Sequence, residues 1–157
     1  MSVNAIKSFV NRTLKDQFIQ KWHRSVSDSD ICSLYKTIKT TLSIEQYLLC
    51  MPLKSRKLLS KIRLSNHKLP VEKGRYSGIP HHERYCNICN PDRLGDEFHI
   101  LFECTNRVVM EARSKFLPVS LTNRPSAQKC SQLLENPTGK TGINLVKFLD
   151  VVLRLFR

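Results

Sequence analysis

The sequence predicts a mostly α-helical fold: a small helical domain that carries an irregular, metal-ordered insert. Three observations support this. Apolar residues recur at spacings of three and four, no segment keeps the period-two alternation of a strand, and three cysteines and a histidine lie close together. At 157 residues the chain can bury one moderate core. We divide it into an N-terminal helical segment (1–62), a cysteine-rich region (63–117) and a C-terminal linker with amphipathic helices (118–157), which together are expected to form one compact unit.

The N-terminal segment is predicted to contain several helices. A second helix should begin near Ile31, and Ser43 with Gln46 forms a capping-box signature for a short helix that stops before Pro52. Pro52 suits the first turn of a further helix, whose apolar stripe contains Leu58, Leu59 and Ile62. The first helix should span residues 3–24 and face the core with six apolar residues: Val3, Ile6, Val10, Leu14, Phe18 and Trp22.

The remaining helices and linkers are predicted from residues that interrupt or cap helices. Prolines and glycines punctuate residues 69–84, which indicates an extended connection. Helices are expected over 106–116 and 126–135, with a linker bracketed by Pro118 and Pro125 between them. The last helix needs a packing partner because it gathers a broad apolar face of Leu145, Phe148, Leu149, Val152 and Phe156.

The charge balance favours a polyanionic partner. The chain has 26 Lys and Arg against 13 Asp and Glu, a formal net charge of +13, which attracts nucleic acid whatever the fold. Charged residues interrupt its longest apolar segment, 143–156, so no membrane-spanning helix is expected. The first residues lack the apolar region of a secretory signal, which predicts an intracellular protein, nuclear or cytoplasmic. Its six cysteines should then be reduced rather than disulfide-bonded.

The pattern C-x2-C-x9-H-x4-C, formed by Cys86, Cys89, His99 and Cys104, predicts a zinc site. Four protein ligands leave no coordination position for substrate, so the Zn²⁺ should be structural and we predict no catalytic residue and no enzyme. The alternative is a set of unrelated buried thiols and a core histidine. The other cysteines, Cys32, Cys50 and Cys130, have no partner at ligand spacing and are assigned to the core.

A catalytic alternative can be set aside. His81-His82-Glu83 followed by Cys86-x2-Cys89 is superficially similar to the signature of zinc nucleobase deaminases. Only two residues separate the two parts, too few to place them on different helices that face one pocket. We therefore expect His81 and His82 to be exposed loop residues.

The run RLSNHKLPVEKGRYSGIPHHERYCNICNPDRLGDEFHILFEC, Arg63 to Cys104, resembles the C-terminal zinc-binding region of non-long-terminal-repeat (LINE-type) retrotransposon reverse transcriptases. As in that family, RL-x-x-H-x-L leads to V-E-x-G-R-Y, I-P and E-R before the first cysteine, and D-E-x-H-x-L-x-x-C completes the site; the similar core extends to about Leu117. The resemblance implies that the four ligands hold zinc and that neighbouring basic residues contact template RNA or target DNA. The Asp-Asp pair of a polymerase is absent from the sequence, so the chain would be an excised piece, a truncated element or a host-retained copy.

The leading hypothesis is a nucleic-acid-binding module, a CCHC knuckle that binds RNA or single-stranded DNA and has no polymerase activity of its own. Its contacts would come from Lys54, Arg56, Lys57, Lys61, Arg63, Lys68, Lys73, Arg75, Tyr76 and Arg84. Tyr76 and Tyr85 could stack on unpaired bases or cover the zinc loop. The alternative is that these basic residues form a solvated surface that binds nothing specific. The rival is a protein-interaction module, whose apolar last helix, with Phe148, Val152 and Phe156, docks on the rest of a reverse transcriptase or on a host protein.

Overall fold

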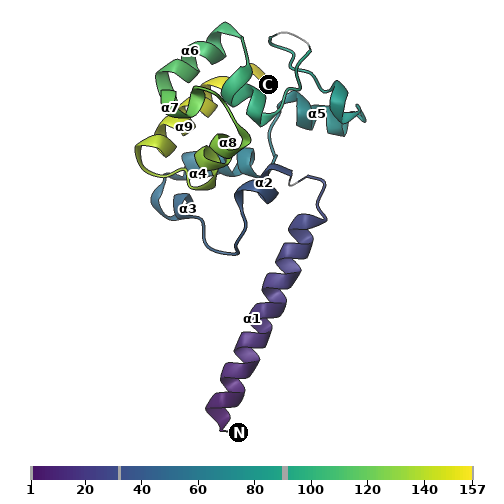
Figure 1. Ribbon diagram of the computed structural model, residues 1–157, viewed down its shortest axis with the longest axis vertical. Helices are drawn as coiled ribbons and strands as arrows, with labels where there is room; N and C mark the ends of the chain where they lie inside the picture. The colour runs from purple at the N-terminus through teal and green to yellow at the C-terminus, as the bar shows by residue number, and fades with distance from the viewer. Residues whose placement is uncertain (1, 32, 90–91, 157) are drawn as a thin grey trace.

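The computed structural model describes residues 2–31, 33–89 and 92–156, and within these ranges the fold is helical, as predicted. The only β structure in the described chain is an isolated bridge between Tyr85 and Leu94. Figure 1 shows a helical body from which α1 extends. The elements are α1 (Val3–Ser27), α2 (Ser33–Ile38), α3 (Gln46–Cys50), α4 (Leu53–Arg63), α5 (Pro70–Tyr76), η1 (His81–Glu83), η2 (His99–Glu103), α6 (Arg107–Phe116), α7 (Val119–Thr122), α8 (Ala127–Glu135), α9 (Gly139–Val152) and η3 (Leu153–Phe156).

Helix α9 is central to the core. It packs against α6 and α4, and its residues Leu145, Phe148, Leu149 and Val152 are at most 1% exposed. Burial of each such side chain contributes about 1.5–3 kcal/mol. The predicted apolar face is therefore confirmed, but the expectation that it docks on another protein is wrong, because α4 and α6 of the same chain already cover it.

Helix α1 forms where the sequence predicted it, but it does not face the core. It projects from the body and contacts it near α2 (Figure 1). None of its residues from Val3 to Ser27 is buried, and Val3 and Phe18 are 67% and 63% exposed. The physical reason is that the core helices already cover one another's apolar faces, so α1 has nothing in the body to pack against.

Residues 70–76 form α5 rather than an extended connection. Pro70 occupies the first turn of the helix, where its missing N–H is no loss. Gly74 is needed inside the helix because a Cβ there would lie 2.5 Å from Cγ of Arg84, whose side chain crosses this point. The two residues that suggested a break therefore have other roles: Pro70 starts the helix, and Gly74 leaves space for the Arg84 side chain.

Two smaller expectations also need correction. Helix α3 follows Glu45 without a side-chain cap, and the Ser43 side chain instead accepts from Nζ of Lys39 at 2.9 Å. Cys50 is exposed, whereas Cys130 is buried as predicted. Cys32 lies outside the described residues. None of the helices in the described ranges combines the length and the apolar character needed to cross a bilayer.

Arg63 lies inside the protein, which corrects its assignment as a nucleic-acid contact. The residue is 1% exposed, and its guanidinium lies 5.2 Å from the ring centre of Tyr47. Nη2 donates to Glu45 at 2.8 Å, and Nη1 donates to the backbone oxygens of Leu134 and of Glu135, the latter at 2.7 Å. A buried arginine therefore caps the C-terminus of α8 and joins it to α4.

Replacing Arg63 by methionine should destabilise the fold by about 3 kcal/mol, because Glu45 and the last carbonyls of α8 lose their buried donor. Urea unfolding followed by circular dichroism measures the change. Lys57→Met, on the exposed face of the same helix, is the control and should shift stability by less than about 0.5 kcal/mol. Equal stabilities of the two variants would contradict the structural role of Arg63.

Candidate metal centre

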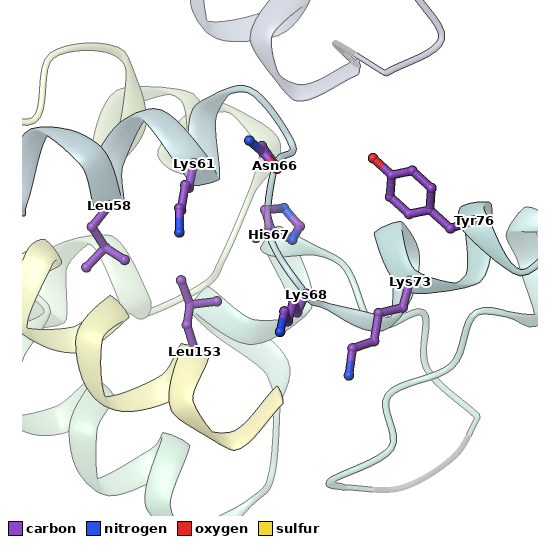
Figure 2. A pocket seen from close by; sticks show the side chains of 8 residues that line it. All are labelled: Leu58, Lys61, Asn66, His67, Lys68, Lys73, Tyr76 and Leu153. Atoms are coloured by element: carbon purple, nitrogen blue, oxygen red, sulfur yellow. The ribbon is translucent and has the colours of Figure 1, made fainter. Parts of the chain in front are cut away.

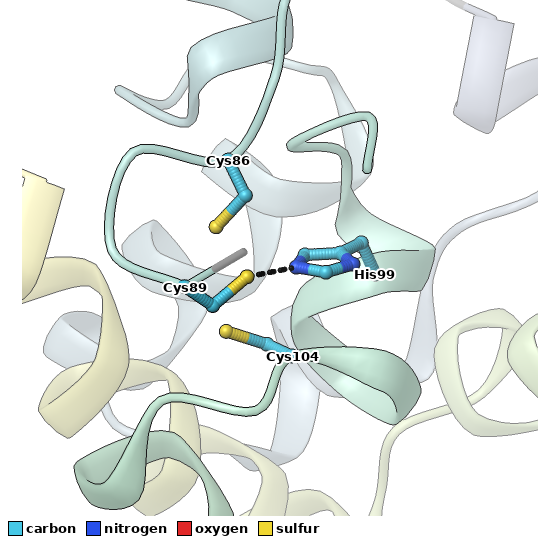
Figure 3. Close-up of side chains that lie close together, drawn as sticks. All are labelled: Cys86, Cys89, His99 and Cys104. Carbon is cyan, nitrogen blue, oxygen red and sulfur yellow. Dashed lines mark hydrogen bonds between the residues drawn. The ribbon is translucent and has the colours of Figure 1, made fainter. Parts of the chain in front are cut away.

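The structure brings the four predicted ligands to one point (Figure 3). Their ligand atoms all lie within 4.8 Å of one another, and Sγ of Cys89 lies 3.1 Å from Nε2 of His99. Neighbouring ligand atoms around a tetrahedral ion are roughly 3.3–3.8 Å apart, so a small adjustment suffices to bind a metal. Cys86, His99 and Cys104 are at most 3% exposed, which places the cluster within the fold.

Cys86 and Cys89 belong to a loop whose two ends are joined by backbone hydrogen bonds. The amide of Cys86 donates to Arg93 at 2.8 Å, and the amide of Gly95 donates to Arg84 at 2.9 Å. Gly95 also lies against α5, where a Cβ would come within 2.7 Å of Cγ of Pro70. The loop therefore holds its two sulfurs in place and rests directly on α5.

His99 and Cys104 lie at the start and just past the end of one wide helical turn, η2. The amide of Cys104 donates to the carbonyl of His99 at 2.7 Å, a π-type bond between residues five apart. In an α-helix such residues would point about 140° apart. The wider turn brings both side chains to the same side. Oδ1 of Asp96 accepts from the His99 amide at 2.8 Å and fixes the start of the turn.

Two residues that the sequence did not mark as functional support the site. Arg113 on α6 donates to the carbonyls of Ile100, Leu101 and Cys104 at 2.8–3.1 Å, which satisfies the end of η2. Asn106 donates from Nδ2 to the carbonyl of Ile88 at 3.0 Å and also caps α6. The sequence predicted a helix over 106–116 but not the cap, and nothing there distinguished Arg113 from the other arginines.

The imidazole of His99 is oriented for coordination through Nε2, which faces the sulfur of Cys89 (Figure 3). Its Nδ1 is buried and has no hydrogen-bond partner among the described residues, although Oε2 of Glu103 lies 3.7 Å away. When Nε2 binds a metal, Nδ1 carries the proton, and a nearby carboxylate is the usual acceptor for it. Glu103 is thus placed to become that acceptor after a small side-chain movement.

A buried His67–Glu97 pair connects the metal loop to the basic segment before it. Nδ1 of His67 accepts from the Leu69 amide at 3.3 Å, so Nε2 carries the hydrogen and donates to Oε1 of Glu97 at 2.7 Å. The hydroxyl of Ser65 donates to the same oxygen at 3.3 Å. Because Glu97 lies two residues before His99, residues 65–69 are held against the turn that carries two ligands.

Burial keeps three of the ligands, Cys86, His99 and Cys104, neutral when no metal is bound. It raises the pKa of the Cys86 thiol and raises the pKa of Cys104 to about 12, while it lowers the pKa of His99. The two thiols therefore carry protons at neutral pH, and the imidazole has a free lone pair. A metal ion that binds here must displace the thiol protons.

The predicted nucleic-acid contacts fall into two groups. The arginines other than Arg63 are half-buried and held by the protein: Arg56 donates to Leu48, Arg75 to Glu72, and Arg84 to Val71 and Ile79. The exposed residues are Lys54, Lys57, Lys61, Lys68, Lys73 and Tyr76. His81 and His82 are exposed, as predicted, and the metal-binding cluster found in the described ranges includes neither.

Comparison of the chain with protein-family profiles, with curated proteins and with solved structures finds no match. The resemblance of residues 63–104 to the retrotransposon region therefore stays a prediction. The site is interpreted from its own geometry.

Metal binding should release protons and weaken as the pH falls. At neutral pH, loading should release at least about two protons per ion, from Cys86 and Cys104. Because each released proton contributes a factor of ten, the apparent affinity should fall by at least roughly 100-fold per unit decrease in pH. A cobalt titration followed by visible absorption measures the apparent affinity at each pH. A pH indicator in the same titration measures the number of protons released. Metal binding without proton release would contradict coordination by these thiols.

Proposed function

We propose that the chain is a zinc-ordered module that binds RNA or single-stranded DNA and has no catalytic activity of its own. The observation that carries the proposal is the buried link between the metal loop and the segment around α5 that exposes several lysines. The proposal agrees with the resemblance to the C-terminal part of a retrotransposon reverse transcriptase, in which such a module would act with the rest of the enzyme. It also suits a nuclear or cytoplasmic protein.

Zinc is the metal that this donor set fits best. Three sulfurs and one imidazole nitrogen match its preference for soft and borderline ligands in a tetrahedral arrangement. The protein supplies all four ligands, so the ion would have a structural role and would stabilise the loop between Cys86 and Cys104. Three thiolates and one Zn²⁺ change the formal charge from +13 to 13 − 3 + 2 = +12, so the protein stays strongly basic.

The exposed lysines supply the attraction for phosphate. Lys57, Lys61, Lys68 and Lys73 form no ion pair with any described residue, and Lys54 is 3.9 Å from Asp150 with a side chain that is 82% exposed. Phosphates that bind such lysines release condensed counterions, which makes the affinity depend on salt. The His67–Glu97 pair and the contact of Gly95 with Pro70 join this surface to the metal loop. Loss of zinc should therefore disturb the lysine positions as well.

Purified protein should contain one zinc per chain and bind a single-stranded oligonucleotide with a steep salt dependence. Each neutralised phosphate should steepen the log-log slope by roughly 0.7. Fluorescence anisotropy at several salt concentrations measures the slope, and elemental analysis measures the metal. Cys89→Ser should lose zinc and bind more weakly, whereas Cys50→Ser, which changes an exposed cysteine outside the cluster, should behave as the parent protein.

Two results would contradict the proposal in different ways. Purified protein without stoichiometric zinc would remove the metal assignment. An affinity that does not change between low and moderate salt would remove the phosphate contacts, whatever the metal content.

The second candidate function is protein contact, and one observation favours it. Helix α1 exposes Val3, Ile6, Val10, Leu14 and Phe18, each at least 45% accessible. Helices in proteins gain most of their stability from packing of an apolar face, so packing against another helix would stabilise α1. We propose a second copy of this chain as the occupant, because every copy brings the same apolar face at the same concentration.

Self-association through α1 should strengthen with salt, the opposite of nucleic-acid binding. The helix carries five Lys and Arg against one Asp, and salt screens the repulsion between two such helices. Sedimentation velocity should show dimers at high salt that Leu14→Glu abolishes, while Arg12→Glu, on the same helix, leaves the apolar stripe and the dimer intact. A monomer at all salt concentrations would contradict this candidate.

A further inference from the structure

A basic groove lies between α4, α5 and the last turn of the chain (Figure 2). Its volume is about 670 Å³, within the roughly 300–1,000 Å³ of pockets that hold small ligands. Leu58 and Lys61 come from α4, Lys73 and Tyr76 from α5, and Leu153 from η3. Asn66, His67 and Lys68 lie between the two helices (Figure 2).

The lysines that line the groove are its only charged groups apart from His67 among the described lining residues. Lys61, Lys68 and Lys73 line the groove, and none of its eight described lining residues is acidic. None of the three lysines forms an ion pair with a described residue, so their charges are not neutralised from within the protein. Three separated ammonium groups favour an extended anion with more than one negative group.

Tyr76 gives the groove an aromatic surface that is already oriented. The guanidinium of Arg75 lies 4.4 Å from the centre of its ring, and Glu72 holds that guanidinium at 2.9–3.0 Å. Arg75 covers part of the ring, yet Tyr76 is 77% exposed. An exposed aromatic ring held beside lysines is suited to stack with a planar group that is attached to an anion.

The rest of the groove suits a nucleotide better than a bare phosphate. Leu58 and Leu153 provide apolar surface at the end away from Tyr76, and the Asn66 amide offers both a donor and acceptors. Arg84 stabilises α5 from outside the groove, because its side chain crosses Gly74 and donates to the carbonyl of Val71 at 3.0 Å. Tyr76 and Lys73 thus extend from a helix that Arg84 stabilises.

We propose that this groove binds unpaired nucleotides of a single strand, with one base stacked on the exposed part of Tyr76 and the adjoining phosphates beside Lys68 and Lys73. The inference rests on the proposed nucleic-acid-binding function and deepens it. In a duplex the bases are stacked on one another, so none is available to Tyr76. The groove therefore makes the protein prefer single strands over duplexes.

The test uses the full zinc-loaded chain, a single-stranded oligonucleotide with one 2-aminopurine, and a duplex of the same length. Tyr76→Ala should weaken single-strand binding by roughly five-fold or more, the loss of about one stacked base, and leave duplex binding unchanged. Tyr76→Trp should restore binding. The fluorescence of 2-aminopurine should be quenched by the parent protein and by Tyr76→Trp, and less by Tyr76→Ala. Phe9→Ala, an aromatic residue on α1 that is 53% exposed and outside the groove, is the matched control.

The outcomes separate the two levels of the proposal. Salt-dependent binding with equal affinity for single strand and duplex, or equal effects of Tyr76→Ala and Phe9→Ala, would overturn the groove and leave the nucleic-acid-binding function standing. An absence of binding to any of the nucleic acids would overturn both. Circular dichroism and zinc content confirm that each variant is folded, so a loss of affinity reports on the groove.

Discussion

The convergence of three sulfurs and one imidazole on a single point is the constraint on which the middle of this structure depends. The described residues in the ranges 84–89 and 92–95 contain little regular structure, and a few backbone hydrogen bonds join the two ranges. The other two ligands, His99 and Cys104, lie at the ends of a π-type turn. Such a turn is less favourable than an α-turn and is tolerated where function requires it. A metal ion shared by the two halves would compensate for both weaknesses, because its binding free energy contributes directly to folding.

From this cluster, a series of buried contacts leads to the basic surface. Asp96 caps the turn that carries His99, and its neighbour Glu97 binds His67. On the loop side, Gly95 rests on Pro70 at the start of α5. These contacts fix the segment between α4 and α5 from two sides. The metal loop thus helps to position the lysines of this segment.

Helices and metal ligands could be predicted from the sequence because periodicity and ligand spacing are local. The elements against which each helix packs could not be predicted in this way. The four ligands and the helices α4, α6, α8 and α9 followed from spacing and caps, which are local. The exposure of α1 could not be predicted, because an apolar stripe shows that a helix needs a partner and not which one. Arg63 is indistinguishable in sequence from the cations around it, since its burial depends on Glu45 and on α8, which lies about 70 residues away. The π-turn has no sequence signature that separates it from an α-turn.

The arginines that stabilise the fold and the lysines of the groove have different roles, and the difference bears on how the protein recognises an anion. Arg63, Arg84 and Arg113 point inward, where a planar group with several donors can satisfy more than one carbonyl. Lysine has a compact, strongly hydrated ammonium that is costly to bury, so Lys61, Lys68 and Lys73 remain outside. The arginines of the predicted interface, which could read a base edge through two parallel hydrogen bonds, are thus committed to the fold: Arg56, Arg63, Arg75 and Arg84. The exposed lysines bind phosphate as point charges and carry little sequence information, so recognition by this surface should depend on strandedness and salt more than on sequence.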